Sequence, residues 1–175
     1  MIDQLIGFLK SFGLALLPWS VVDAWQKAVV LRFGKYHRTL EPGFHWMIPF
    51  VETVHALCVV TNTTTLRAQS VTMADGKVVT TEAIIRWSVG DIKIYALEIT
   101  DASNVVTDLA QGAIASVLRA SVMGDPTLDS SIQKEARKQL SRFGIKVEAI
   151  TLTTFAPVKV IRLVGAFQTA THETQ

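Results

Sequence analysis

The stretch SVTMADGKVVT (Ser70–Thr80) carries the strongest turn signal in the 175-residue chain. Asp75-Gly76 is a pair typical of two-residue hairpin turns, because both residues tolerate the positive φ that such turns require. β-Branched residues on both sides of the pair favour extended backbone. The stretch therefore predicts two antiparallel strands joined at residues 75–76.

Extended segments are expected to continue on both sides of this hairpin. Residues 77–89 predict one long strand. Along one side of it lie Val79, Thr81, Ala83, Ile85, Trp87 and Val89. Residues 54–60 and 61–71 are also extended in character, and residues 27–33 (KAVVLRF) predict a further strand. We therefore expect an antiparallel, β-rich first subdomain over residues 25–90.

Two amphipathic helices are expected after these strands. The first covers residues 102–123, and its apolar stripe consists of Val106, Leu109, Ala113, Val117 and Leu118. Pro126 stops this helix from continuing, and Thr127 is a suitable cap for a second helix that ends at Gly144. The inward side chains of the second helix are Leu128, Ile132, Ala136 and Leu140.

A strand and a last helix complete the expected order of elements. Residues 145–155 (IKVEAITLTTF) alternate as a strand does, and residues 158–170 are largely apolar and predict a short helix. We therefore expect an α/β second subdomain over residues 91–157, then a short C-terminal helix and tail over residues 158–175. The two subdomains together give an α+β fold.

Residues 1–24 differ from the rest of the chain and are expected to form a membrane anchor. From Ser11 to Val22 there are 12 residues without a charge, fewer than the about 20 apolar residues of a simple span. A proline breaks this run, so a monotopic or re-entrant helix or hairpin fits better, with an ordinary buried helix as the open alternative. The expected anchoring residues are Leu5, Leu9, Phe12, Leu16, Leu17, Pro18 and Trp19.

The basic residues favour one side of a membrane and argue against nucleic acid. The chain has 17 basic and 15 acidic residues, and the basic ones are scattered. A nucleic-acid-binding surface would gather them on one face. Only Lys10 lies inside the apolar segment, whereas four basic residues follow it closely: Lys27, Arg32, Lys35 and Arg38. By the positive-inside rule we expect the folded domain on the cytoplasmic face.

The sequence offers no pattern that indicates catalysis, a cofactor or a metal site. It lacks the phosphate-binding, dinucleotide, zinc-protease and serine-hydrolase motifs. His37, Glu41 and His45 would align on a helix, but Pro42 interrupts that helix. Cys58 is the single cysteine and is expected to be a small hydrophobe in a strand. We therefore predict that the protein is not an enzyme.

Apolar side chains recur at alternate positions soon after the anchor. They are Phe44, Trp46, Ile48 and Phe50. We expect them to form a membrane-facing loop, and the alternative that remains open is plain core packing.

Several segments carry a family resemblance. AVVLRFGKYHRTLEPGFHWMIPFVETV (Ala28–Val54) resembles the opening of the Band 7 domain of the superfamily that contains stomatins, prohibitins and flotillins (SPFH proteins). The likeness continues, in the family's order, through Ser70–Thr80, Asp108–Ala120, Thr127–Asp129 and Phe143–Thr153. The resemblance implies two linked subdomains, of which the first lies against the membrane.

The resemblance also implies a function without catalysis or a cofactor. Proteins of this family form rings or cages that organise a membrane patch and regulate resident proteases and channels. The expected partners are thus membrane lipids, further copies of the chain and a protease or channel. The chain resembles a short member, because the family's long charged coiled coil is not seen before Gln175. We expect a stomatin-like scaffold; the alternative is an adaptor or inhibitor of one membrane protease or host factor.

Overall fold

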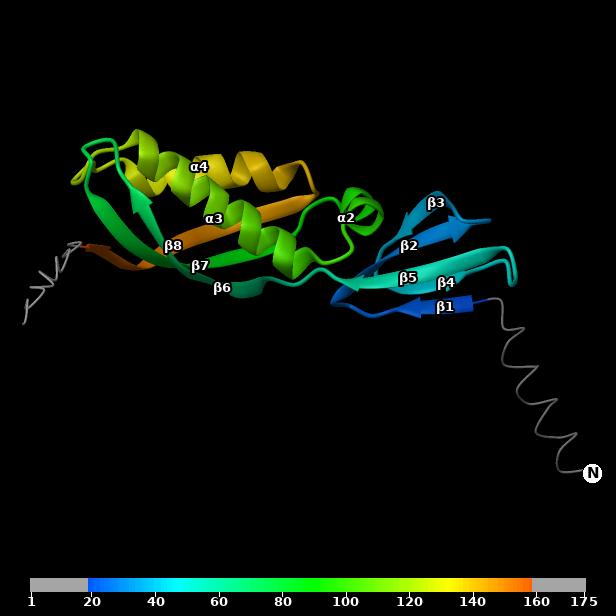
Figure 1. Cartoon of the computed structure of the whole chain (residues 1–175). Helices are drawn as coiled ribbons and strands as arrows, with labels where there is room; N and C mark the ends of the chain where they lie inside the picture. Colours follow the sequence, from blue (N-terminus) through cyan, green and yellow to red (C-terminus); the bar gives the residue numbers. More distant parts are fainter. Residues whose placement is uncertain (1–18, 159–175) are drawn as a thin grey trace, which may run out of the picture.

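Five short strands make up the first part of the molecule. The computed structural model describes residues 19–158, and Figure 1 shows an elongated molecule with this first part at one end. The strands are β1 (Trp19–Val22), β2 (Gln26–Arg32), β3 (Lys35–Leu40), β4 (Gly43–Trp46) and β5 (Glu52–Cys58). All pairs are antiparallel: β3-β2-β5 form one sheet, and β1 and β4 form a separate two-stranded ribbon.

A small core joins this ribbon to the sheet. Ala28 and Val30 are two residues apart on β2 and therefore point to the same face. Val22 of the ribbon packs against that face together with Leu40, and Val54 is partly buried beside them. A two-stranded ribbon is marginally stable on its own, so this contact holds it in place.

Three strands and two helices make up the second part. The strands β6 (Asn62–Thr72), β7 (Val78–Val89) and β8 (Ile145–Pro157) form an antiparallel sheet with β7 in the centre. The helices α3 (Ala102–Ala120) and α4 (Leu128–Ser141) lie on one face of this sheet (Figure 1). Alternate residues of β7 point into the core beneath the helices, as the sequence pattern predicts. The α+β fold is therefore confirmed.

A short helix, α2 (Ile92–Glu98), lies between the two parts (Figure 1). Asp91 caps it by accepting hydrogen bonds from the backbone N–H groups of Lys93 and Ile94. The Lys93 ammonium lies 4.8 Å from the centre of the Tyr36 ring on β3, which links the helix to the first part.

Sheet membership changes at residues 59–61, whereas the predicted subdomain boundary is at residue 90. Strands β6 and β7 pair with each other and then with β8, and β5 pairs with β2. The alternation in residues 77–89 predicts a buried face but does not identify the elements that cover it. The stripes of α3 and α4 cover it here, so the hairpin belongs with the helices.

Two stretches that were expected to be anchor and loop are strands. Residues 19–22 form β1 and residues 43–46 form β4, because each offers the other a hydrogen-bonding partner. The cap of α4 also differs: the Thr127 hydroxyl donates to Asp125 and makes no capping bond to the helix.

Some predictions fall outside the described residues. The anchoring residues Leu5, Leu9, Phe12, Leu16, Leu17 and Pro18 do so, and so does nearly all of the helix expected at residues 158–170. Within residues 19–158, no helix combines the length and apolar character needed to cross a membrane.

Candidate functional site

The outer face of the β1–β4 ribbon is apolar and exposed. Trp19 lies opposite Trp46 and Val21 opposite Phe44 in the register of the two strands. These four residues are called the aromatic face below. Their side chains are 43%, 65%, 67% and 55% exposed in the order named. The core packing that was left open for Phe44 and Trp46 is therefore wrong.

The three aromatic rings of this face contact one another. Ring centroids are 6.2 Å apart for Trp19 and Phe44, 6.3 Å for Trp19 and Trp46, and 5.8 Å for Phe44 and Trp46. The last two pairs meet edge to face, an arrangement that aromatic rings favour. The rings thus form one continuous surface that residues 19–158 leave uncovered.

Two phenylalanines stand at turns near the aromatic face. Phe50, with φ +66°, is 81% exposed in the β4–β5 turn, and Phe33, with φ +48°, is 79% exposed in the β2–β3 turn. The Phe33 N–H donates to the Val51 carbonyl at 3.1 Å, which ties the two turns together. We call Phe33 and Phe50 the phenylalanine tip. Ile48, before the second turn, is also exposed.

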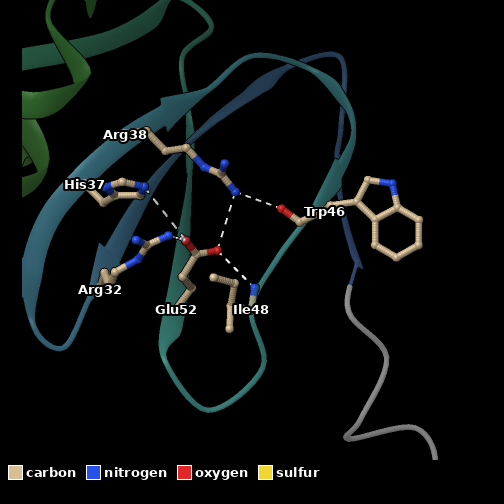
Figure 2. Close-up of polar contacts among 6 residues, drawn as sticks. All are labelled: Arg32, His37, Arg38, Trp46, Ile48 and Glu52. Atoms are coloured by element: carbon tan, nitrogen blue, oxygen red, sulfur yellow. Dashed lines mark hydrogen bonds and ion pairs between the residues drawn. The ribbon is translucent and has the colours of Figure 1, made fainter.

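A buried carboxylate lies directly behind these turns (Figure 2). The Glu52 side chain is 1% exposed, and its Oε1 accepts from Arg32 Nη2 at 2.7 Å. Its Oε2 accepts from the Ile48 N–H at 3.1 Å and from Arg38 Nη2 at 3.4 Å. His37 Nε2 lies 4.0 Å from Oε1. We call Glu52, Arg32, Arg38 and His37 the Glu52 cluster.

Strand register places the Glu52 cluster at the end of the small core. Arg32 follows Val30 on the same face of β2, and Glu52 lies opposite Arg32 on β5. Arg38 lies opposite Val30 on β3, and an irregularity after that pair leaves His37 as an extra residue. The ion cluster thus continues the face that carries the core and closes its open end.

The surroundings hold Glu52 in its charged form. The hydrogen bond from Arg32, followed by the one from the Ile48 N–H, lowers the pKa of the Glu52 carboxyl below its usual 4.5, against the opposing effect of burial. Arg38 also donates to the Trp46 carbonyl at 2.7 Å. Glu52 therefore fixes the ion cluster to the segment that follows the aromatic face.

The residues considered as metal ligands have separate partners. His45 Nε2 is 2.7 Å from the Glu41 carbonyl oxygen, the Glu41 carboxylate pairs with Lys27, and His37 faces Glu52. Among residues 19–158, no group of three or more histidine, cysteine or acidic side chains is arranged to hold a metal.

Cys58 lies in a strand, as expected, and is exposed at the end of β5. The strand β5 is an edge strand of the first sheet.

The comparisons with known proteins agree with the resemblance seen in the sequence. The model of the family described as "SPFH domain / Band 7 family" matches residues 20–175. An uncharacterised protein of Methanothermobacter thermautotrophicus is 30% identical over 75% of this chain and 40% of its own length. Protein HflK of Vibrio parahaemolyticus is 34% identical over 77% of this chain and 34% of its own length.

A third relative has a name that states a role. The modulator of FtsH protease HflC of Escherichia coli K12 is 32% identical over 44% of this chain and 25% of its own length. The chain aligns with less than half the length of each of these three relatives.

Proposed function

The chain belongs to the SPFH domain/Band 7 family, and we propose that it is a membrane-associated scaffold without catalytic activity. In this proposal it self-associates on the cytoplasmic face of a membrane and regulates a resident membrane protein. The observation that carries the proposal is the exposed apolar end of the first part.

This end gathers apolar side chains from separate elements. The start of β1, the β2–β3 turn and the β4–β5 turn all lie at the end of the molecule away from α3 and α4 (Figure 1). They carry the aromatic face and the phenylalanine tip, together with Ile48. Soluble monomers rarely leave large apolar patches uncovered, and tryptophan is favoured at the headgroup level of a bilayer. A membrane surface supplies the missing cover.

The N-terminal segment would provide the permanent attachment. In the proposal, Leu5, Leu9, Phe12, Leu16, Leu17 and Pro18 enter the membrane ahead of the aromatic face. Pro18 immediately precedes Trp19 at the start of β1, so the proposed anchor joins the chain next to the aromatic face.

A membrane-bound protease is the proposed client. The relative named as a modulator of FtsH protease supports this choice. The same name also supports the second candidate, an adaptor or inhibitor that binds one membrane protease without forming a large assembly. The mass of the detergent-extracted particle, measured by light scattering, separates the two. A ring-sized particle supports the scaffold, and a monomer or dimer supports the adaptor.

Flotation of the full chain with phosphatidylcholine vesicles tests the membrane contact. Phe44→Ser/Trp46→Ser removes two apolar side chains from the aromatic face and is expected to weaken binding. Leu97→Ser/Val122→Ser removes two side chains that are similarly exposed, 50% and 52%, in α2 and after α3, and it is expected to bind as the unchanged protein does. Deletion of residues 1–18, which leaves β1 intact, tests the anchor. Equal flotation of all variants would refute this function.

A further inference from the structure

We propose that the exposed end of the first part recognises anionic phospholipids: Arg32 and Arg38 bind lipid phosphate, and the phenylalanine tip enters the bilayer beside them. The inference rests on the proposed function, because it names the lipid class for the same membrane-facing end.

The two arginines have hydrogen-bond donors to spare. A guanidinium carries five N–H donors. Within residues 19–158 the structure gives Arg32 one acceptor, Glu52 Oε1, and gives Arg38 two, Glu52 Oε2 and the Trp46 carbonyl. The side chains of Arg32 and Arg38 are 38% and 42% exposed, whereas that of Glu52 is 1% exposed. The Nε atom of each arginine is buried without a hydrogen-bond partner among the described residues, so the donors that reach the surface belong to the Nη groups, and the carboxylate does not reach it.

Glu52 holds these donors in place without cancelling their charge. Arg32, Lys35 and Arg38 are three fixed cations at this end, against one carboxylate, which leaves a net charge of +2. A guanidinium presents a planar fork that matches phosphate oxygens, and the hydrogen bonds to Glu52 fix the direction of each fork. The arrangement favours an anionic group over a zwitterionic one.

The phenylalanine tip is held in a strained conformation. Phe33 and Gly34 are the two residues between β2 and β3, and both have positive φ. Such a turn favours Asn-Gly, and a bulky residue at the first position is strained. Phe50 is strained in the same way, and both rings are about four-fifths exposed. Within residues 19–158 this strain yields no buried contact, and strain of this kind is typical of positions that contact a partner.

A bilayer fits this end better than a second copy of the chain does. In a two-fold contact, the same surface would face itself and bring two positive ends together. An anionic bilayer offers opposite charge to the arginines and an apolar layer to the rings within a few ångströms of each other. Both features of the site are then matched by one partner.

The test compares the affinity of the full chain for phosphatidylcholine vesicles with and without phosphatidylglycerol, at low salt. Arg32→Gln/Arg38→Gln removes the two guanidiniums. Lys134→Gln/Lys138→Gln removes the same charge from exposed positions on α4 and is the matched control. Glu52→Gln removes the carboxylate and leaves both arginines. Thermal unfolding of each variant reports whether it is folded.

The preference for anionic vesicles is expected to fall roughly fivefold for each arginine removed and to stay unchanged in the control. Glu52→Gln is expected to keep or raise the preference, because the amide oxygen that remains can still accept a hydrogen bond from an arginine while a competing negative charge is removed. A purely structural role for the cluster predicts the opposite, that is, a loss in Glu52→Gln as large as in the arginine variant. That result would overturn the inference.

The remaining outcomes separate the inference from the proposed function. Equal binding of the unchanged protein to both kinds of vesicle refutes the lipid preference and leaves membrane association intact. Binding to neither refutes both. If the arginine variant alters the mass of the detergent-extracted particle but not the vesicle preference, a second copy covers this end and the inference is wrong.

Discussion

The two parts of the molecule differ in how much of their apolar surface they bury. The second part has a core cluster of 17 buried residues, whereas the cluster in the first part has four. The first part instead exposes the aromatic face and the phenylalanine tip and closes its core with ions. The second part can therefore hold itself together, while the first depends on the Glu52 cluster and on whatever covers its exposed end.

Replacing one buried leucine by alanine in each core should give the largest difference in unfolding free energy between the two parts. Leu118 of α3 is 0% exposed in the large core, and Leu40 of β3 is 4% exposed in the small one. Leu118→Ala is expected to cost about 4 kcal/mol of unfolding free energy, and Leu40→Ala about 2 kcal/mol, because a small core relaxes around the cavity more easily. Urea unfolding followed by circular dichroism measures both. Equal costs would show that the small core is as tightly packed as the large one.

The two parts also differ in the residues that adopt a positive φ: these include phenylalanines in the first part, and only glycines in the described residues of the second. In the second part, Gly144 has φ +70°, and a Cβ there would overlap the Asp91 carbonyl oxygen. Gly144→Ala is expected to cost about 2 kcal/mol or more, from strain and from this overlap. Gly112→Ala on α3, where a Cβ has open space, should instead stabilise the protein by up to about 1 kcal/mol. If thermal unfolding showed that both substitutions change the stability in the same direction, the overlap at Gly144 would not explain the cost.

Substitution by asparagine at a left-handed position of the phenylalanine tip should raise the free energy of unfolding, whereas Gly144→Ala should lower it. Phe33→Asn places a favoured residue in a left-handed position, so the free energy of unfolding is expected to rise by about 1 kcal/mol while vesicle binding weakens. Phe33→Ala removes the same ring and keeps the strain, so it should weaken vesicle binding without that gain. Thermal unfolding and flotation measure the two effects. Unchanged vesicle binding in both variants would show that the ring does not contact lipid.

The sequence predicts the long elements of the second part better than the short strands of the first. The strand at residues 77–89 was predicted correctly, and Val106, Ala113 and Leu118 of the predicted stripe on α3 are buried, because periods of 2 and 3.6 residues follow from local backbone geometry. The other two members of that stripe are only partly buried, and the buried Ala110 and Ile114 were not predicted. The pairing of β6 and β7 with β8 was not predicted, because an alternating pattern of apolar residues does not identify the element that covers them. Strands β1 and β4 are four residues each, and the alternation of apolar residues that begins at Phe44 runs past the end of β4, so it did not predict this strand.

The site was predicted only in part. The exposure of Phe44, Trp46, Ile48 and Phe50 agrees with a membrane-facing surface, while their contact with lipid stays a prediction. Phe33 was missed, because a bulky residue is not expected at the first position of a two-residue hairpin turn, although Gly34 marks the turn itself. The Glu52 cluster was missed because its members come from three strands and an irregularity in β3 decides which side chains meet.

Low pH should reduce the stability of the first part through protonation of Glu52, and this is the smallest of the expected effects. The pKa of this carboxyl is lowered in the folded state, chiefly by the hydrogen bond from Arg32. A lowered pKa contributes stability that is fully present above the unfolded value near 4.5 and is lost as the pH falls through the folded value. Glu52→Gln lacks this contribution. Its stability deficit against the unchanged protein should therefore be largest near neutral pH and shrink below pH about 4.5.

Tryptophan fluorescence can locate this effect in one part of the molecule. Trp19, Trp25 and Trp46 lie in the first part, and Trp87 is the single tryptophan in the second. In a Trp87→Phe background, unfolding followed by fluorescence reports on the first part, and circular dichroism reports mainly on the helices of the second. A deficit that stays constant with pH would mean that packing, and not the charge of Glu52, holds the cluster together. A deficit that shrinks in both signals at the same urea concentration would mean that the two parts unfold as one unit, despite their unequal cores.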